Sequence, residues 1–143
     1  MKIVVKKSGL DISLVAAKLP EKLRLWLADK VGEFAFREMK WRAPKGKTRQ
    51  LWKSINKRAQ GLEVKITPRA PHAIFVEEGT VPHEILPVNA QALRFEMHGK
   101  IIFAKRVSHP GTAPQPFVRE TADATRARIP QFWGDLWRDV ERW

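Results

Sequence analysis

The sequence predicts an α+β domain in which an antiparallel sheet lies between a long N-terminal helix and a C-terminal helix packed on it. Apolar residues recur every three or four positions near both ends of the chain, which is the period of a helix that buries one face. Between these segments the period changes to two, as in strands with one buried face. With 143 residues, of which 43% are hydrophobic, the chain suits a single domain over residues 1–143.

The N-terminal region begins with residues 2–7, which are rich in Ile and Val and predict a short edge strand. Residues 11–19 have room for one or two helical turns. Pro20 then suits the first position of a longer helix that runs to about Trp41, because proline needs no N–H partner there. The expected core face of this helix comprises Leu19, Leu23, Trp26, Leu27, Val31, Phe34, Ala35 and Met39.

The stretch after this helix is basic. Residues 42–47 contain a proline and a glycine and predict an exposed loop. The apolar spacing of residues 51–55 then predicts a second, short helix that ends before Gly61.

The middle of the chain is expected to form the sheet. Residues 62–66 alternate in polarity and predict a strand, and the apolar run at residues 73–76 suggests another. Residues 93–104 predict a hairpin that turns at His98 and Gly99. Residues 82–89 contain two prolines and predict a loop or arm.

The chain returns to helical spacing from Gln115 onward. Phe117 is expected to seat this helix on the sheet or on an adjacent subunit, with the contact inside the chain preferred. Pro130 should kink or restart the helix, because its ring clashes with the preceding turn.

The positive charge is confined to one half of the chain. Net charge is +12, and residues 1–70 hold 18 Lys and Arg against 6 Asp and Glu, whereas residues 71–143 hold 9 of each. Residues 40–58, the basic segment, contain eight cations and no acid: Lys40, Arg42, Lys45, Lys47, Arg49, Lys53, Lys57 and Arg58. Such a segment either contacts a polyanion or acidic partner, or is a solvated stretch that keeps the protein soluble.

Composition excludes several functions. There is no cysteine, so disulfides, thiolate metal sites and a cysteine nucleophile are absent. The first residues do not form a signal peptide, and no window is apolar enough for a transmembrane helix, so no membrane contact is expected.

Three strings occur in order along the chain: APKGKTRQLWKSI at residues 43–55, HAIFVEEGTVPH at 72–83 and HPGTAPQPFVRETA at 109–122. The ordered set resembles the phage minor tail component family, the neck proteins of lambdoid siphophages. The residues that carry the resemblance are Leu51, Ser54, Ile55, Val76, Glu77, Gly79, Thr80, His109, Pro110, Gly111, Pro116 and Phe117. This chain departs from the family at three positions, with Arg49 for Gly, His72 for Tyr and Glu78 for an aromatic residue.

The resemblance implies a structural, non-enzymatic protein of the head-to-tail junction of a phage or prophage, which acts by ring assembly. Its partners would be further copies of itself, the phage connector and tail proteins, with non-specific contact with DNA left open. It would lie in the virion, and in the host cytoplasm during assembly, with no cofactor. Residues 77–88 would lie at an inter-subunit or head-to-tail surface. The turns at Gly79 and Gly111 are expected to need glycine for backbone geometry.

Catalytic interpretations find less support. Glu77, Glu78, His83 and Glu84 are close in sequence, and His72 and His109 could join them, but no metal-ligand spacing is met. Ser108 and His109 are adjacent and would point apart on a strand. We therefore expect no catalytic, cofactor or metal residues.

Six tryptophans provide candidate subunit contacts, because aromatic anchors dominate interfaces. Three of them fall in the last eleven residues: Trp133, Trp137 and Trp143. Besides the neck protein, two further hypotheses remain, a basic nucleic-acid-binding module and a small toxin-like ribonuclease.

Overall fold

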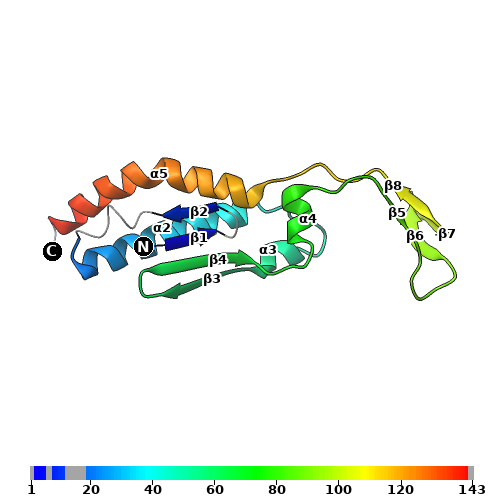
Figure 1. Ribbon diagram of the computed structural model, residues 1–143, viewed down its shortest axis with the longest axis horizontal. Helices are drawn as coiled ribbons and strands as arrows, with labels where there is room; N and C mark the ends of the chain where they lie inside the picture. Colours follow the sequence, from blue (N-terminus) through cyan, green and yellow to red (C-terminus); the bar gives the residue numbers. More distant parts are fainter. Residues whose placement is uncertain (1, 6–7, 12–18, 142–143) are drawn as a thin grey trace. The chain divides into compact units, whose positions relative to one another are not determined.

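The computed structural model describes residues 2–5, 8–11 and 19–141 and confirms the α+β class (Figure 1). The chain divides into two compact units, Met1–Ala73 with Pro116–Trp143, and Ile74–Gln115. That residues 1–143 fold as one domain remains a prediction. The expected helical turns at residues 11–19 fall almost wholly on residues 12–18, and Trp143 is also outside the described residues.

The first unit contains a four-stranded sheet with the order β2-β1-β4-β3. Its strands are β1 (Lys2–Val5), β2 (Ser8–Asp11), β3 (Ile55–Gln60) and β4 (Glu63–Pro68). Neighbouring strands are antiparallel except β1 and β4, which run parallel. The predicted edge strand is therefore an inner strand, because β2, which the sequence did not reveal, pairs with its free side.

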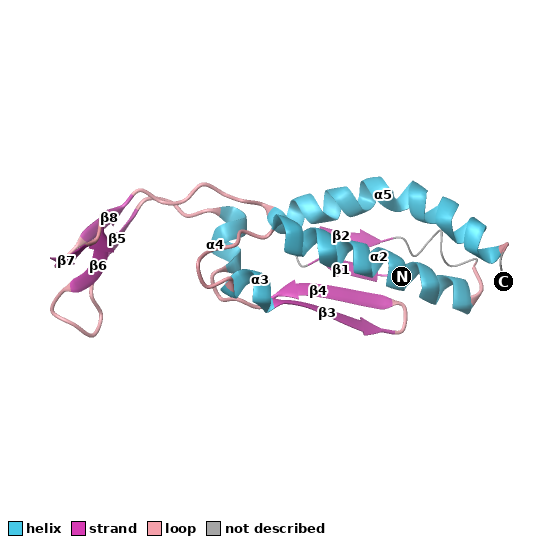
Figure 2. Ribbon diagram, turned by 180° about the vertical axis from the view of Figure 1, so that it is seen from behind, coloured by secondary structure: helices cyan, strands magenta, loops and turns pink. Residues whose placement is uncertain are grey.

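Helix α2 (Glu21–Arg42) begins directly after Pro20, within one residue of the predicted bounds. Its buried residues are Leu27, Ala28, Val31, Gly32, Ala35 and Met39. Strands β1 and β2 lie in front of α2 in Figure 1 and behind it in Figure 2, and α2 also contacts β3 and β4, so α2 covers one face of the sheet. The approach is close, because a Cβ atom at Gly32 would lie 2.6 Å from Cγ1 of Val64.

Helix α5 (Phe117–Val140) packs beside α2. The rings of Phe34 and Phe132 meet edge to face with centroids 5.6 Å apart. Thr121 and Thr125 are buried, and each hydroxyl donates to the carbonyl four residues earlier at 2.7 Å, so neither is left without a partner.

The predicted restart at Pro130 is wrong, because α5 continues through this residue. Pro130 is exposed, whereas Phe132 and Leu136 in the following turns are buried. Proline lacks the N–H that would donate to the carbonyl four residues earlier, and burial of these two side chains offsets the loss of that hydrogen bond.

Two local predictions in the middle of the chain are also corrected. Helix α3 is limited to Gln50–Ser54, and the following residues form β3, because they pair with β4 over six rungs. The apolar run at residues 73–76 belongs to a helix, α4 (Ala73–Glu78). A four-residue apolar run does not distinguish a strand from a helical turn.

The second unit, residues 74–115, contains most of α4 and two successive two-stranded ladders, and we call it the ribbon. Its first ladder pairs β5 (His83–Ile85) with β8 (Val107–His109), so part of the predicted loop at residues 82–89 is a strand. The Thr80–Thr112 bridge continues the same register. The second ladder pairs β6 (Leu93–Met97) with β7 (Lys100–Ala104) and confirms the predicted hairpin.

The turn of this hairpin has the expected residues. His98 has φ 53° and Gly99 has φ 76°, so both central residues occupy the left-handed region that a two-residue turn of type I′ requires.

Candidate functional site

Two cations of the basic segment are engaged by side chains of the first unit. The Lys40 ammonium lies 4.2 Å from the centre of the Trp52 ring. Arg42 forms ion pairs with Glu38 of its own helix and with Glu120 of α5, the latter with Nε and Oε2 3.8 Å apart. These two side chains stabilise the fold and are not free to bind a partner.

Lys57 is the third engaged cation. Its ammonium donates to the Glu33 carboxylate over 2.5 Å, which joins β3 to α2. The hydrogen bond from Lys57 holds the pKa of Glu33 below its ordinary value, against the opposing effect of burial. The pair is partly exposed, so it contributes modestly to stability.

The other five cations of the basic segment have exposed side chains: Lys45, Lys47, Arg49, Lys53 and Arg58. Arg49 has φ 52° and ψ 26°, a left-handed conformation. This is the position at which the phage family is expected to have Gly, so the departure in sequence falls where glycine would fit the backbone without strain.

The hairpin β3–β4 brings together cations that the sequence analysis did not connect. Arg58 lies directly opposite Lys65, and Arg69 follows at the end of the same hairpin. With Asn56 and Thr67 they line a hollow of about 170 Å³, which we call the cationic hollow. The register of the hairpin reveals this hollow, whereas the apolar spacing of the sequence predicts a helix over the residues that form β3.

The first of the three strings contributes Leu51 and Ile55 to the core. Leu51 and Ile55 are each 4% exposed, and the Ser54 hydroxyl donates to the Leu51 carbonyl at 2.7 Å. Phe117, from the third string, is 2% exposed and buried within the first unit. Burial of these side chains stabilises the first unit.

Residues 74–83 of the second string and 109–115 of the third belong to the ribbon, where the two segments pair. Thr80 and Thr112 exchange two backbone hydrogen bonds, of 2.9 and 3.1 Å. The Gln115 N–H donates to the Val76 carbonyl at 2.8 Å, and His83 lies opposite His109. Most of the matched residues of these two strings, from Val76 to Thr80 and from His109 to Gly111, therefore fall in one paired segment.

The His83 and His109 rings lie side by side, with their centroids 5.1 Å apart. Nδ1 of His109 accepts the Gly111 N–H, and Nδ1 of His83 lies 2.9 Å from the Val81 carbonyl oxygen. Ser108 lies opposite Glu84, on the next rung of the ladder. Among the described residues, no three His, Cys, Asp or Glu side chains are placed to hold a metal ion.

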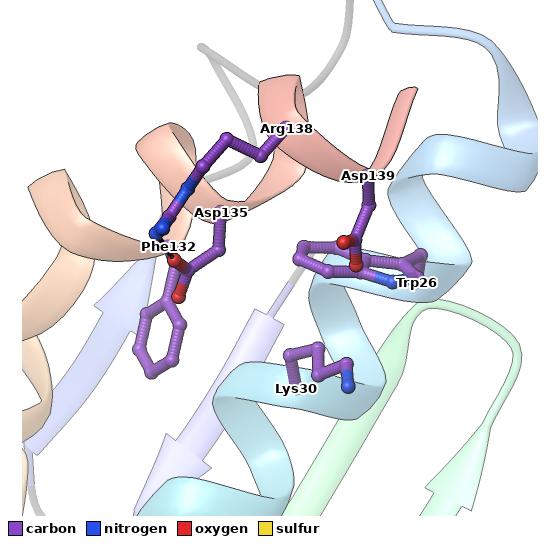
Figure 3. A pocket seen from close by; sticks show the side chains of 6 residues that line it. All are labelled: Trp26, Lys30, Phe132, Asp135, Arg138 and Asp139. Atoms are coloured by element: carbon purple, nitrogen blue, oxygen red, sulfur yellow. Dashed lines mark hydrogen bonds and ion pairs between the residues drawn. The ribbon is translucent and has the colours of Figure 1, made fainter. Parts of the chain in front are cut away.

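A pocket of about 250 Å³ lies between α2 and α5 (Figure 3). In this pocket Arg138 forms an ion pair with Asp135, and the Lys30 ammonium lies 5.5 Å from the centre of the Trp26 ring. Its lining residues, which also include Phe132 and Asp139, offer no hydroxyl, thiol or imidazole nucleophile.

The ribbon has a large apolar surface. None of its residues, 74–115, is buried. Nine large apolar side chains in it are exposed: Ile74, Phe75, Val81, Ile85, Leu86, Val88, Met97, Ile101 and Phe103. An apolar surface of this extent is characteristic of an interaction site.

The tryptophans divide between core and surface. Trp133 is half-buried, and Trp137 is 58% exposed. Trp41, which the sequence analysis did not select, is more exposed still, at 71%. Its position at the end of α2 keeps it off the buried face, because Met39 and Ala43 occupy that face on either side.

Comparison with known proteins found no matching family model, no matching curated protein and no matching solved structure. The described helices include none long and apolar enough to cross a membrane.

Proposed function

We propose that this protein is a structural component of the head-to-tail junction of a tailed phage or prophage, a neck or tail-completion protein that acts by forming a ring. The three ordered strings, and their resemblance to the phage minor tail component family, support the phage assignment. Parts of two of the strings fall in the ribbon, which holds nine exposed large apolar side chains.

The observation that carries the proposal is the absence of any buried residue between 74 and 115. A two-stranded ribbon is at best marginally stable alone in water. Strand β7 is moreover apolar on both faces, since Ile101, Ile102, Phe103 and Ala104 follow one another without alternation. Strands of this kind are normally covered on both faces. Another protein surface that covers the ribbon therefore accounts for its sequence.

A second copy of the ribbon is the best-matched occupant of this surface. The ribbon contains four acidic and four basic residues and is neutral, whereas the whole chain carries +12. Contact between ribbons is thus not opposed by net charge, while contact between the first units is. A ring requires that two different faces of neighbouring ribbons meet, and that the rotation between successive copies closes.

Sedimentation velocity over a range of protein concentrations tests this proposal. The wild-type protein should form a discrete oligomer, and the variant Ile101→Ser/Phe103→Ser should remain monomeric with an unchanged far-UV spectrum. The matched control is Gln60→Ser/Glu63→Ser, an exposed and directly opposed pair of the first unit that lies outside the ribbon and should assemble normally. A wild-type protein that stays monomeric, or a double serine variant that still assembles, contradicts the proposal.

Variants of the exposed loop cations test whether this loop binds an acidic protein or DNA. Charge reversal at Lys45, Lys47 and Arg49 should abolish the joining of tails to heads while affinity for duplex DNA is retained, because opposite charges set the register with an acidic connector or tail protein. Normal joining with a loss of salt-sensitive DNA binding would show that the loop faces DNA.

A further inference from the structure

The outer face of the hairpin β3–β4 is polar and open to solvent. Directly opposed residues of an antiparallel pair share one face of the sheet. Val64 and Ile66 are buried on the inner face, under α2. The outer face therefore presents the alternate rungs, Arg58 opposite Lys65 and Asn56 opposite Thr67.

Arg69 completes this face. Its backbone N–H donates to the Ser54 carbonyl at 3.2 Å, which extends the pairing beyond the last rung of the ladder. The cationic hollow is therefore lined by three cations, one hydroxyl and one amide, with no carboxylate among its lining residues. All five side chains can donate hydrogen bonds to an anion.

The arrangement is unfavourable without a ligand. Like charges directly opposite each other in a sheet destabilise it, and Arg58 and Lys65 are such a pair. Within the part of the chain that the structure describes, Arg58, Lys65 and Arg69 form no ion pair. The neighbouring Lys57, on the inner face, is paired with Glu33. Uncompensated repulsion of this kind is expected at binding sites.

We propose that the cationic hollow binds a backbone phosphate of duplex DNA. A phosphate offers several acceptor oxygens to donors that converge from two strands, and arginine matches its geometry with paired N–H groups. The hollow, at about 170 Å³, admits a single small anion. It has no aromatic lining residue on which an unpaired base could stack, which favours a duplex over a single strand. This inference does not rest on ring assembly, because the site lies within one hairpin.

Fluorescence anisotropy with a short labelled DNA duplex, over a series of salt concentrations, tests the site. The variant Arg58→Gln/Lys65→Gln/Arg69→Gln should bind at least roughly tenfold more weakly, and the slope of log affinity against log salt should fall by about 1, since one phosphate contact is lost. Removal of the repulsion leaves the fold intact, which circular dichroism checks.

The matched control removes the same charge elsewhere. Lys45→Gln/Lys47→Gln/Lys53→Gln should bind DNA with a much smaller loss. Equal losses in the two triple variants would overturn the site, because net charge alone would then explain binding. DNA affinity that is unchanged in the hollow variant would overturn it as well.

Two further measurements distinguish the ligand. In NMR spectra of the wild-type protein, inorganic phosphate should shift the backbone amides of Asn56 and Thr67 selectively, and no shift would contradict an anion site. Polyglutamate should compete weakly for the duplex. Polyglutamate that binds more tightly than DNA, with the same dependence on Arg58, Lys65 and Arg69, would assign the hollow to an acidic protein instead.

Discussion

Gly79 and Gly111 lie on opposite strands of the ribbon, and each leaves room for the backbone of the other strand. A Cβ atom at Gly79 would lie 2.5 Å from the Thr112 carbonyl oxygen, and one at Gly111 would lie 2.2 Å from the Thr80 carbonyl oxygen. Both have positive φ, 73° and 87°. This confirms that the two turns need glycine for backbone geometry.

Substitution of either glycine should open the pairing between them. Gly79→Val or Gly111→Ala should destabilise the ribbon by about 1 kcal/mol or more, because the strained φ and the clash with a carbonyl act together. The backbone N–H of Thr80 donates to the Thr112 carbonyl, and that of Thr112 donates to the Thr80 carbonyl. Hydrogen exchange at these two N–H groups reports the effect directly.

Gly99→Ala is the control for the backbone angle alone. Gly99 has φ 76°, but a Cβ atom there would meet nothing within 4 Å. Its substitution should leave exchange at Thr80 and Thr112 unchanged. If Gly111→Ala also left these amides protected, the close approach of the two strands would be refuted.

Arg49 provides a test of a strained position in the first unit. Its φ of 52° costs a side chain energy that glycine does not incur. Arg49→Gly should therefore be more stable than Arg49→Ala by about 1 kcal/mol, although both lose the same charge. Urea denaturation of the two purified variants measures the difference. Equal midpoints would contradict the left-handed conformation at this residue.

Elements that depend on interactions between residues close in sequence could be predicted, whereas elements that depend on contacts between distant residues could not. Helix α2 and the β6–β7 hairpin depend on local signals, a helical period after Pro20 and a two-residue turn at His98 and Gly99, and both were predicted from the sequence. Strand β3 was not, because its partner β4 determines its conformation. The candidate sites depend on distant contacts in the same way. The sequence shows the basic segment as a run of cations, but only contacts within the fold determine which of these cations are paired and which are exposed.

The pair of Glu33 and Lys57 predicts a dependence of stability on pH. Because the pKa of Glu33 is lowered in the folded protein, its contribution is present above the pKa of an unfolded glutamate and is lost as pH falls through the folded pKa. Glu33→Gln should remove this contribution, below about 1 kcal/mol for a partly exposed pair, at neutral pH.

Denaturation at neutral and acidic pH measures this contribution. The difference in stability between wild type and Glu33→Gln should shrink as the pH is lowered. Glu63→Gln, an exposed glutamate of β4, is the matched control and should show no such convergence. A constant difference at all pH values would mean that the pair does not stabilise the ionised carboxylate.

Leu136 and Trp137 are adjacent in α5 and should separate folding from assembly. Leu136 is 1% exposed, so Leu136→Ala leaves a cavity and should lower the free energy of unfolding by about 3 kcal/mol. Trp137 is 58% exposed, so Trp137→Ala should leave unfolding nearly unchanged. As a predicted subunit contact, however, Trp137 should be needed for full self-association, because exposed tryptophans are frequent interface anchors. Thermal unfolding and sedimentation velocity on both variants measure the two effects. A Trp137→Ala protein that assembles like the wild type would remove α5 from the interface and leave the ribbon as the candidate contact.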